Sequence, residues 1–527
     1  MLKQNPDSKI LVIGAGVGGL SAALRLAAAG RDVLVVEKSA APGGKLRSVP
    51  SAAGPVDTGP TVLTMLPVFE EIFAQAGEQI TDHLSISQEE TLARHWWPDG
   101  TTLDLFADRE ASAEAVREFA GAKAEDEFRN FCATTARLFQ AFEKPVMQSE
   151  KPNLGRIIAA TLARPDLISH LRPGRTLWKA LSRQFSDHRL RQLFARYATY
   201  VGGSPFLTPA LISLIWHAEA SGVWTVGGGM AKLAKAFEAV ACRHGAHFQY
   251  DDGADRIERN PDGTFHVHMQ SAAHHHVRTV LFNGDPAALA NGHLGPDVVA
   301  AVKARHVEKR ALSAWVWAFA AEPTGRALAH HNVFFNTQYR REFQAIDTGI
   351  MPDDSALYVC AQDRQNGFAP DGPERFEIII NGAPVAPDSR EIPEEYQQCL
   401  IHTFTTLAAR GLHFDQIPGR AALSTPHDFA RRFPGSGGSL YGQSPHGMMA
   451  SFRRPVVRSR IPGLYLAGGG VHPGAGLPMA ATSGRLAAEA ILKDLALTSR
   501  SRRTVTHGGM STDFQTVGAT ASRSSVS

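Results

Sequence analysis

An apolar run that ends in a cluster of glycines constrains this chain more than any other feature. Residues 10–13 read Ile-Leu-Val-Ile, a pattern typical of a strand buried on both faces. Four glycines follow within the next six residues: Gly14, Gly16, Gly18 and Gly19. The alanine- and leucine-rich residues 20–29 then predict a helix. Together these segments predict a strand, a tight turn and a helix that packs closely on the strand.

The spacing of these glycines, together with an acid further along, indicates a nucleotide-binding turn. Gly14 permits the turn, Gly16 lets the backbone approach a pyrophosphate, and Gly19 allows the helix to pack on the strand. A second strand, 33–36, ends at Glu37, whose carboxylate can accept hydrogen bonds from both hydroxyls of an adenosine ribose. This order of elements therefore predicts a dinucleotide site with the phosphates at the helix N-terminus.

A second glycine-rich segment follows Lys38 and indicates which dinucleotide is bound. It reads Pro-Gly-Gly-Lys-Leu over 42–46 and Asp-Thr-Gly-Pro-Thr over 57–61. These glycines allow another close backbone approach, whereas an NAD-binding domain would pass into another helix here. The segment therefore favours FAD over NAD, with a glycine-rich surface loop as the alternative.

The far end of the chain carries a third glycine-rich segment. Residues 464–470 predict a short buried strand and a turn, and Ala480–Leu492 predict a helix, with Gly476 and Pro478 in the loop between them. A helix N-terminus near Met479 would stabilise negative charge on the N1–C2=O edge of a reduced flavin. Nucleotide-binding segments at both ends predict that the termini return to one domain and that the middle is an insertion.

Taken together, these segments resemble the FAD-dependent carotenoid desaturases of the phytoene desaturase family, within the wider flavin amine oxidase group. The resemblance runs from about residue 8 to about residue 495, and the wording HPGAGLP at 472–478 is its most specific part. It implies an α/β fold, with a Rossmann-like FAD-binding domain of the flavin amine oxidase and phytoene desaturase type and an inserted α+β substrate domain. The residues that it assigns to the cofactor site are Gly14, Gly16, Gly18, Gly19, Glu37, Lys38, Gly43, Gly44, Lys45, Leu46, Gly59, Pro60, Thr61, Ala254, Asn283, Gly468, Gly469, Gly476, Leu477, Pro478 and Met479.

Two internal segments narrow the resemblance. GVWTVGGGMAKLAKAF at 222–237 and LYGQSPHGMMASFRRP at 440–455 are most similar to the 1-hydroxycarotenoid 3,4-desaturases of purple bacteria. The resemblance then implies hydride transfer from the C3–C4 bond of a 1-hydroxy- or 1-methoxycarotenoid to the flavin, which leaves a C=C bond. A long apolar tunnel would hold this hydrophobic substrate, and dioxygen or a membrane quinone would accept the electrons. Phytoene is the alternative substrate.

The expected FAD-binding domain is divided into three parts along the chain. These parts cover 1–85, 224–300 and 441–496, while a helical, membrane-facing insertion covers 86–223, the substrate-domain sheet covers 301–440 and a disordered tail covers 497–527. Short aromatic and β-branched runs predict strands at 312–320, 333–336, 356–361 and 376–381. Asn-Pro-Asp-Gly at 260–263 predicts the turn of a hairpin.

Composition excludes several other classes of protein. With 43% hydrophobic and 20% charged residues the chain is globular, and a net charge of +3 gives no reason to expect nucleic acid binding. No apolar stretch reaches the roughly 18–20 residues needed to cross a bilayer. The chain is therefore expected to be cytoplasmic and peripherally associated with the membrane. Free thiols rather than disulfides are expected at the widely spaced Cys132, Cys242, Cys360 and Cys399.

A basic stretch suggests where a membrane would be contacted. Residues 153–196 carry nine basic and two acidic side chains, with leucine, isoleucine and tryptophan between them. A basic amphipathic surface with Trp is what an interfacial helix needs. A solvated helix pair that packs on its own domain is the alternative. A carotenoid substrate would be loaded from lipid, which favours membrane contact.

Catalytic side chains stay unassigned by the sequence. Loss of hydride beside a polyene leaves an allylic cation with an acidic proton, so a strong protein base is not required. Trp224 is a candidate for tunnel lining, and His472 for positioning the cofactor or acting as a base. His217 and Glu219 lie two apart on an expected helix and cannot share a face, which favours structural roles. His274–His276 are expected in a solvated hairpin, and no metal is expected.

Three other functions share parts of this pattern. A flavin amine oxidase would need an aromatic pair facing the flavin, which the HPGAGLP loop does not offer. A polyene cis–trans isomerase of the same family would need no net electron acceptor. A prenyl-carrying escort protein without flavin would have no use for the glycines at 14–19, the diglycine at 43–44 or Glu37.

Overall fold

Strands from three distant stretches of the chain form one parallel sheet. The structure is a computed structural model that describes residues 9–152, 155, 174–386, 389–450 and 452–504. The strand order is β21-β13-β1-β2-β9. The strands are β1 (Lys9–Ile13), β2 (Asp32–Val36), β9 (His247–Gln249), β13 (Thr279–Phe282) and β21 (Leu464–Leu466).

The register of this sheet brings the two ends of the chain together. Ile10 of β1 lies opposite Thr279 of β13, and Val280 lies opposite Leu464 of β21, all in parallel pairs. Strand β1 is also parallel to β2. Strands β1, β13 and β21 are almost fully buried, as their apolar runs require. The prediction that both ends fold into one Rossmann-like α/β domain is therefore confirmed.

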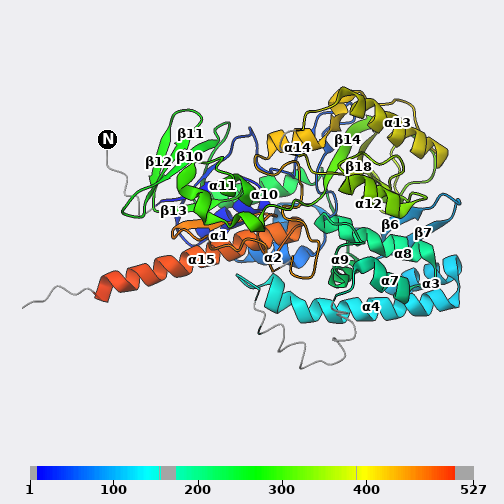
Figure 1. Cartoon of the computed structure of the whole chain (residues 1–527), viewed down its shortest axis with the longest axis horizontal. Coiled ribbons are helices and arrows are strands. Elements are labelled where there is room, and N and C mark those ends of the chain that lie inside the picture. The colour runs from blue at the N-terminus through cyan, green and yellow to red at the C-terminus, as the bar shows by residue number, and fades with distance from the viewer. Residues whose placement is uncertain (1–8, 153–154, 156–173, 387–388, 451, 505–527) are drawn as a thin grey trace, which may run out of the picture.

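Helices cover the faces of this sheet (Figure 1). They are α1 (Val17–Ala28), α2 (Leu66–Ala74), α10 (Ala231–Arg243), α11 (Pro286–Ala290) and α15 (Leu477–Thr504). Helix α15 differs from the prediction at both ends. It begins at Leu477 because Pro478 is favourable in the first turn of a helix. It continues beyond 496, where a disordered tail was expected, and residues 505–527 lie outside the described residues.

A small antiparallel sheet flanks the parallel one. It contains β10 (Ala254–Arg259), β11 (Phe265–Met269) and β12 (His274–Val277). The turn at 260–263 joins β10 to β11, so the predicted hairpin is confirmed. Strand β12 carries His274–His276 on the edge of this sheet.

A larger mixed sheet forms the second half of the molecule, at the right of Figure 1. Its order is β20-β14-β18-β17-β16-β6-β7. The strands are β6 (Thr91–Trp96), β7 (Thr102–Phe106), β14 (Ser313–Ala321), β16 (His331–Phe334), β17 (Leu357–Ala361), β18 (Glu374–Gly382) and β20 (Leu423–Ser424). The four strands predicted between 312 and 381 are confirmed. Strands β6 and β7 come from the stretch expected to be a helical insertion, and β6 pairs with β16.

The two faces of the large sheet are covered by different helices. Helix α13 (Pro393–Ala409) packs on one face, where Phe404 contacts Trp317 with ring centroids 5.5 Å apart. The helices on the other side of this half are α3 (Arg109–Ala120), α4 (Ala122–Phe142), α7 (Leu177–Gln184), α8 (His188–Ala195) and α9 (Ile215–Ala220). Two shorter helices, α12 (Tyr339–Asp347) and α14 (Pro426–Arg432), complete this half.

The remaining short strands pair two by two. These are β3 (Ser48–Val49), β4 (Val56–Asp57), β5 (Ile86–Gln88), β8 (Trp224–Val226), β15 (Pro323–Gly325) and β19 (Leu412–Phe414). The four cysteines are free thiols, as predicted. Within the described part of the chain, no helix is long and apolar enough to cross a membrane.

The basic stretch predicted to meet a membrane is described only in part, because 153–154 and 156–173 lie outside the described residues. In α7, Leu177 and Leu181 are buried in the protein core, whereas Lys179 and Arg183 are exposed. The apolar side of this helix is therefore used for internal packing, and its charged side faces outward.

Candidate functional site

The glycine turn has the geometry that a pyrophosphate needs. Gly14 has a φ of +100°, and its N–H donates to Val36 O on the neighbouring strand over 2.8 Å. Helix α1 follows at once, with Gly16 as its N-cap. It has no side-chain cap and no acid in its first turn, so its leading N–H groups are left for an anion.

Asn283, predicted to bind the cofactor, holds the glycine turn in place. Its Nδ2 donates to Gly14 O over 3.0 Å and to Gly16 O over 3.2 Å. A Cβ on Gly18 would lie 2.6 Å from Asn283 Oδ1 and 2.7 Å from the backbone nitrogen of Gly468. Asn283 Oδ1 is buried and has no hydrogen-bond partner among the described residues. The three predicted cofactor segments around 14–19, 283 and 468 therefore meet at this side chain.

Glu37 lies at the end of β2, where the sequence predicts the ribose acid. Its carboxylate accepts from the backbone N–H of Ala15 over 2.8 Å and of Ser39 over 2.9 Å. An ionised carboxylate offers about four acceptor positions. Two positions are thus left for the hydroxyls of a ribose. Ala254 lies nearby, because Asp252 N donates to Glu37 O over 3.1 Å and a Cβ on Gly253 would lie 3.0 Å from Lys38 Cβ.

The diglycine and the DTGPT segment pack onto this turn. Gly43 N donates to Ala15 O over 2.8 Å, and Leu46 N donates to Gly43 O over 3.0 Å. A Cβ on Gly59 would lie 2.0 Å from Lys45 O, so the two loops touch through backbone atoms. Pro60 follows, and Thr61 Oγ1 is 2.9 Å from the hydroxyl of Tyr358 on the large sheet. The segment therefore connects the cofactor turn to the second half of the molecule.

Lys45 belongs to a group of charges that sequence reasoning did not foresee. Its Nζ donates to Leu440 O over 2.6 Å, and Arg454 donates to Gly469 O over 2.9 Å. Arg310 forms an ion pair with Asp285, and all four charged groups interact. Burial lowers the pKa of Lys45 to about 8 and that of Arg454 to about 10. Three cations thus share one acid, and an enclosed excess of positive charge calls for an anion.

The loop after β21 provides open space beside these charges. A Cβ on Gly469 or on Gly476 would meet nothing within 4 Å. Gly468 is fixed by its N–H, which donates to Ser483 Oγ over 2.8 Å. Leu477, Pro478 and Met479 form the first turn of α15, one residue beyond Gly476. Excess positive charge, free N–H groups and glycine-lined space fit an anionic flavin dinucleotide.

His472 anchors the glycine loop through one of its two ring nitrogens. Its Nε2 lies 2.9 Å from Val146 O and 3.1 Å from Ser149 O, so the ring donates to carbonyl groups. The side chain is 1% exposed, and burial lowers its pKa to about 4. The imidazole therefore stays neutral and ties the glycine loop to residues 146–149, the positioning role that the sequence favours.

Glu219 and His217 make structural contacts inside the protein. Glu219 is buried and accepts from the hydroxyls of Tyr197 over 2.6 Å and Tyr200 over 2.8 Å. The His217 ring packs on Phe139 with centroids 5.0 Å apart. Trp224 is half-buried in β8. Its backbone N–H donates to Leu63 O over 2.8 Å, which places Trp224 next to the residues that follow the DTGPT segment.

The parallel sheet, its glycine turn and the second half of the molecule built on the large mixed sheet form the architecture of a flavoprotein oxidoreductase. The sequence profile described as "Flavin containing amine oxidoreductase" matches residues 17–492. The chain belongs to this family, and a flavin is its cofactor.

Two relatives and one solved structure agree with this assignment. A hydroxyneurosporene desaturase of Cereibacter sphaeroides is 50% identical and covers 93% of this chain and 99% of its own length. The hydroxyneurosporene desaturase of Rubrivivax gelatinosus is 44% identical, and the match covers 97% of this chain and 98% of that protein. An oxidoreductase of Methanosarcina mazei shares the fold, with a TM-score of 0.59, 16% identity and coverage of 92% and 100%. The predicted carotenoid desaturase family is thereby confirmed.

Replacement of Glu37 tests the ribose site. We expect Glu37→Gln to weaken cofactor binding about 10- to 100-fold, because a hydrogen bond to a charged group is worth about 1.5–3 kcal/mol. The measurement is the dissociation constant of FAD for the apoprotein. Asp32→Asn, at the exposed opposite end of β2, is the control and should bind FAD like the parent. Equal affinity of both variants would contradict the assignment.

The lowered pKa of His472 predicts that the folded protein becomes less stable in acid. This pKa falls from 6.5 to about 4 on folding, so the unfolded chain binds the proton more tightly. This group's contribution is fully present above pH 6.5 and is lost as the pH falls towards 4, a change of about 3 kcal/mol. We expect His472→Gln to show a shallower decline of Tm over this range. An unchanged slope would show that the imidazole titrates normally.

Proposed function

We propose that this flavoprotein is an FAD-dependent carotenoid 3,4-desaturase acting on a 1-hydroxy- or 1-methoxycarotenoid. The observation that carries the proposal is the convergence of three glycine-rich segments and an excess of buried cations at one site. The relatives named for hydroxyneurosporene support the substrate class. When bound, FAD supplies a hydride acceptor. The chain's own residues bind it, place the carotenoid beside it and exclude water.

The cations beside the glycine loop serve the redox step. Lys45 and Arg454 would stabilise the negative charge that a bound flavin gains when it accepts a hydride, and both interact with Asp285 and Arg310. The first turn of α15 adds its N-terminal partial positive charge at Gly476. Because these groups are fixed by hydrogen bonds before the reaction, no reorganisation is needed when charge develops.

Proton loss then needs no strong base. The substrate carbon that gives up hydride becomes part of an allylic cation spread along the polyene, and the neighbouring C–H becomes acidic. His472 is neutral and committed to two carbonyl groups, so we assign it no proton transfer.

Turnover of defined substrates tests the proposal. The purified protein should be yellow, and its flavin absorption should bleach when a 1-hydroxycarotenoid in liposomes is added without oxygen. Product chromatography should then show one additional C=C bond next to the polyene. Bleaching by phytoene alone would contradict the substrate choice, and a colourless protein that binds no FAD would contradict the enzyme class. Turnover under air in quinone-free liposomes separates dioxygen from a quinone as electron acceptor.

We also propose that a membrane surface is contacted beside α7. Leu207, Met448 and Met449 are 45%, 53% and 42% exposed, and Gly447 N donates to Leu207 O over 3.2 Å, so they form one patch. Leu177 N donates to Thr208 O, which places this patch at the start of α7 with its exposed Lys179 and Arg183. Exposed apolar side chains beside cations match an anionic lipid surface.

Flotation with anionic liposomes tests this contact. A variant with Leu207→Ser, Met448→Ser, Lys179→Gln and Arg183→Gln should float less than the parent protein. Phe368→Ser removes an equally exposed apolar side chain elsewhere, 63% exposed, and should float normally. Equal flotation of all three proteins would contradict the contact.

A further inference from the structure

Three buried side chains with metal-binding chemistry meet at the junction of the two halves. His330 precedes β16, His331 begins it, and Cys360 lies opposite His331 on the antiparallel strand β17. They are 7%, 2% and 0% exposed. A ring nitrogen of each histidine and Sγ of Cys360 all lie within 4.8 Å of one another. The redox site described above uses none of them.

The histidine rings are held as metal-ligating histidines usually are. His330 Nδ1 lies 2.7 Å from Arg364 O, so it donates there, and Nε2 faces Cys360 Sγ at 3.5 Å. Arg364 is itself fixed by two hydrogen bonds of 2.7 Å to Glu374. A ring N–H held by a backbone carbonyl sets the tautomer that leaves the other nitrogen free for a cation.

One ring nitrogen of His331 has no hydrogen-bond partner among the described residues. His331 Nδ1 lies 2.7 Å from the hydroxyl of Tyr358, and its Nε2 is buried with no hydrogen-bond partner among the described residues. Such an unsatisfied buried nitrogen is costly without a partner. Burial lowers the pKa of His330 to about 4 and lowers the pKa of His331 well below its usual value. Neutral imidazole is the form that binds metals.

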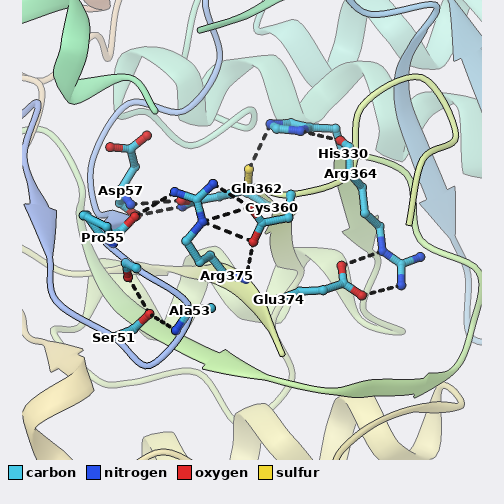
Figure 2. Close-up of polar contacts among 12 residues, drawn as sticks. Ser51, Ala53, Pro55, Asp57, His330, Cys360, Gln362, Arg364, Glu374 and Arg375 are labelled. Atoms are coloured by element: carbon cyan, nitrogen blue, oxygen red, sulfur yellow. Dashed lines mark hydrogen bonds and ion pairs between the residues drawn. The ribbon is translucent and has the colours of Figure 1, made fainter. Parts of the chain in front are cut away.

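A cleft leads to these side chains. It is lined by Asp57, Thr61, Gln362 and Arg375 together with His330 and Cys360, and it holds about 40 Å³ of space. That is room for roughly three waters at about 10–15 Å³ each. Figure 2 shows His330 and Cys360 joined across the two strands, with Asp57, Gln362 and Arg375 around them. The cleft gives a cation a path and a place for a water ligand.

We propose that His330, His331 and Cys360 form a binding site for Zn²⁺, with the fourth position open to a water in the cleft. Two imidazoles and one thiolate are a ligand set that zinc prefers. Zn–N and Zn–S bonds of about 2.0–2.3 Å require ligand atoms about 3.3–3.7 Å apart. The 3.5 Å between His330 Nε2 and Cys360 Sγ already satisfies this spacing. Binding exchanges the Cys360 S–H proton for the cation and releases it to solvent, with no change of oxidation state.

Such a site would link the strands of the large sheet to the cofactor loop. Cys360 and His331 belong to β17 and β16, while Tyr358 connects His331 to Thr61 of the DTGPT segment. A cation here would therefore stabilise the junction on which the substrate side of the flavin depends. This role is separate from desaturation, so the proposal does not depend on the substrate chosen above.

Cobalt substitution tests the site in the flavin-loaded protein. Tetrahedral Co²⁺ with a thiolate ligand has intense bands in the red, away from flavin absorption. The metal-free parent protein should develop these bands with a single equivalent of Co²⁺, and Zn²⁺ should abolish them. Cys360→Ser should lose them, whereas Cys242→Ser, on an exposed cysteine, should keep them.

A second variant guards against binding elsewhere. His266 and His276 stack on the small antiparallel sheet with ring centroids 4.4 Å apart, and they are the obvious competitor. His276→Gln should leave the bands unchanged. Zn²⁺ should raise the Tm of the parent but not of Cys360→Ser, whose flavin content confirms that it folds. Bands that persist in Cys360→Ser, or that disappear with His276, would overturn the proposal.

Discussion

Gly484→Ala is expected to lose most of its flavin and to unfold at a clearly lower temperature. Gly484 lies where α15 crosses α1, and an added Cβ would stand 2.0 Å from Gly18 O and 3.0 Å from Ser21 Cβ. Ser21 Oγ donates to Ala481 O over 2.8 Å at the same crossing. Backbone cannot yield as a flexible side chain can, so the helices must separate at the cofactor turn. Overpacking of this kind costs about 3 kcal/mol.

The sign of this effect separates packing from helix propensity. In an exposed helix, Gly→Ala stabilises by about 1 kcal/mol, so a gain in Tm would contradict the close crossing. Gly419→Ala is the control, because a Cβ there meets nothing within 4 Å. The measurements are Tm and flavin per polypeptide. A rigid crossing predicts that both fall together for Gly484→Ala and that neither changes for Gly419→Ala.

The fold could be predicted where local signals were strong. Residues close together in the sequence are enough to predict the buried runs at 10–13 and 464–466, the glycine turn and the acid at 37. Their common sheet followed because two nucleotide-binding segments must share one ligand. Strands β6 and β7 lie in the stretch expected to be a helical insertion, and the place of β6 beside β16 was not predicted, because parallel pairing across more than 200 residues leaves no trace in the local pattern.

The site was harder to predict than the fold. Sequence can reveal a residue whose role depends on backbone freedom, as for Gly468 and Gly476, or on its position after a strand, as for Glu37. Folding alone brings together Arg454, Arg310 and Asp285, and their spacing in the sequence does not predict this cluster. Arg454 lies within the segment 440–455 that carried the family resemblance, which was the one available signal. The sequence did not show that Asn283 holds the turn through two hydrogen bonds of its side chain, because these bonds form only when distant segments fold together.

A buried ionic network on the second half should be even less tolerant of change. Glu219 is 3% exposed and accepts from the hydroxyls of both Tyr197 and Tyr200, while Arg196 Nη2 lies 4.0 Å from its carboxylate. Arg196 also donates to the Tyr200 hydroxyl over 2.8 Å. Glu219→Ala would leave a buried guanidinium without this counter-charge and two buried hydroxyls without this acceptor. Removing one partner of a buried pair costs about 3–5 kcal/mol.

We therefore expect Glu219→Ala to lower Tm more than any exposed substitution and to shorten the half-life of activity on warming. Glu219→Gln keeps an acceptor for the tyrosines and should lose less, which separates lost charge from lost shape. Glu110→Ala is the matched control, because Glu110 is 72% exposed although it pairs with Arg129 at 2.8 Å. Exposed pairs contribute about 0.2–1 kcal/mol, so its Tm should barely move. Equal effects of Glu219→Ala and Glu110→Ala would mean that water reaches Arg196, and the buried network would then not hold the segment 196–201 to α9.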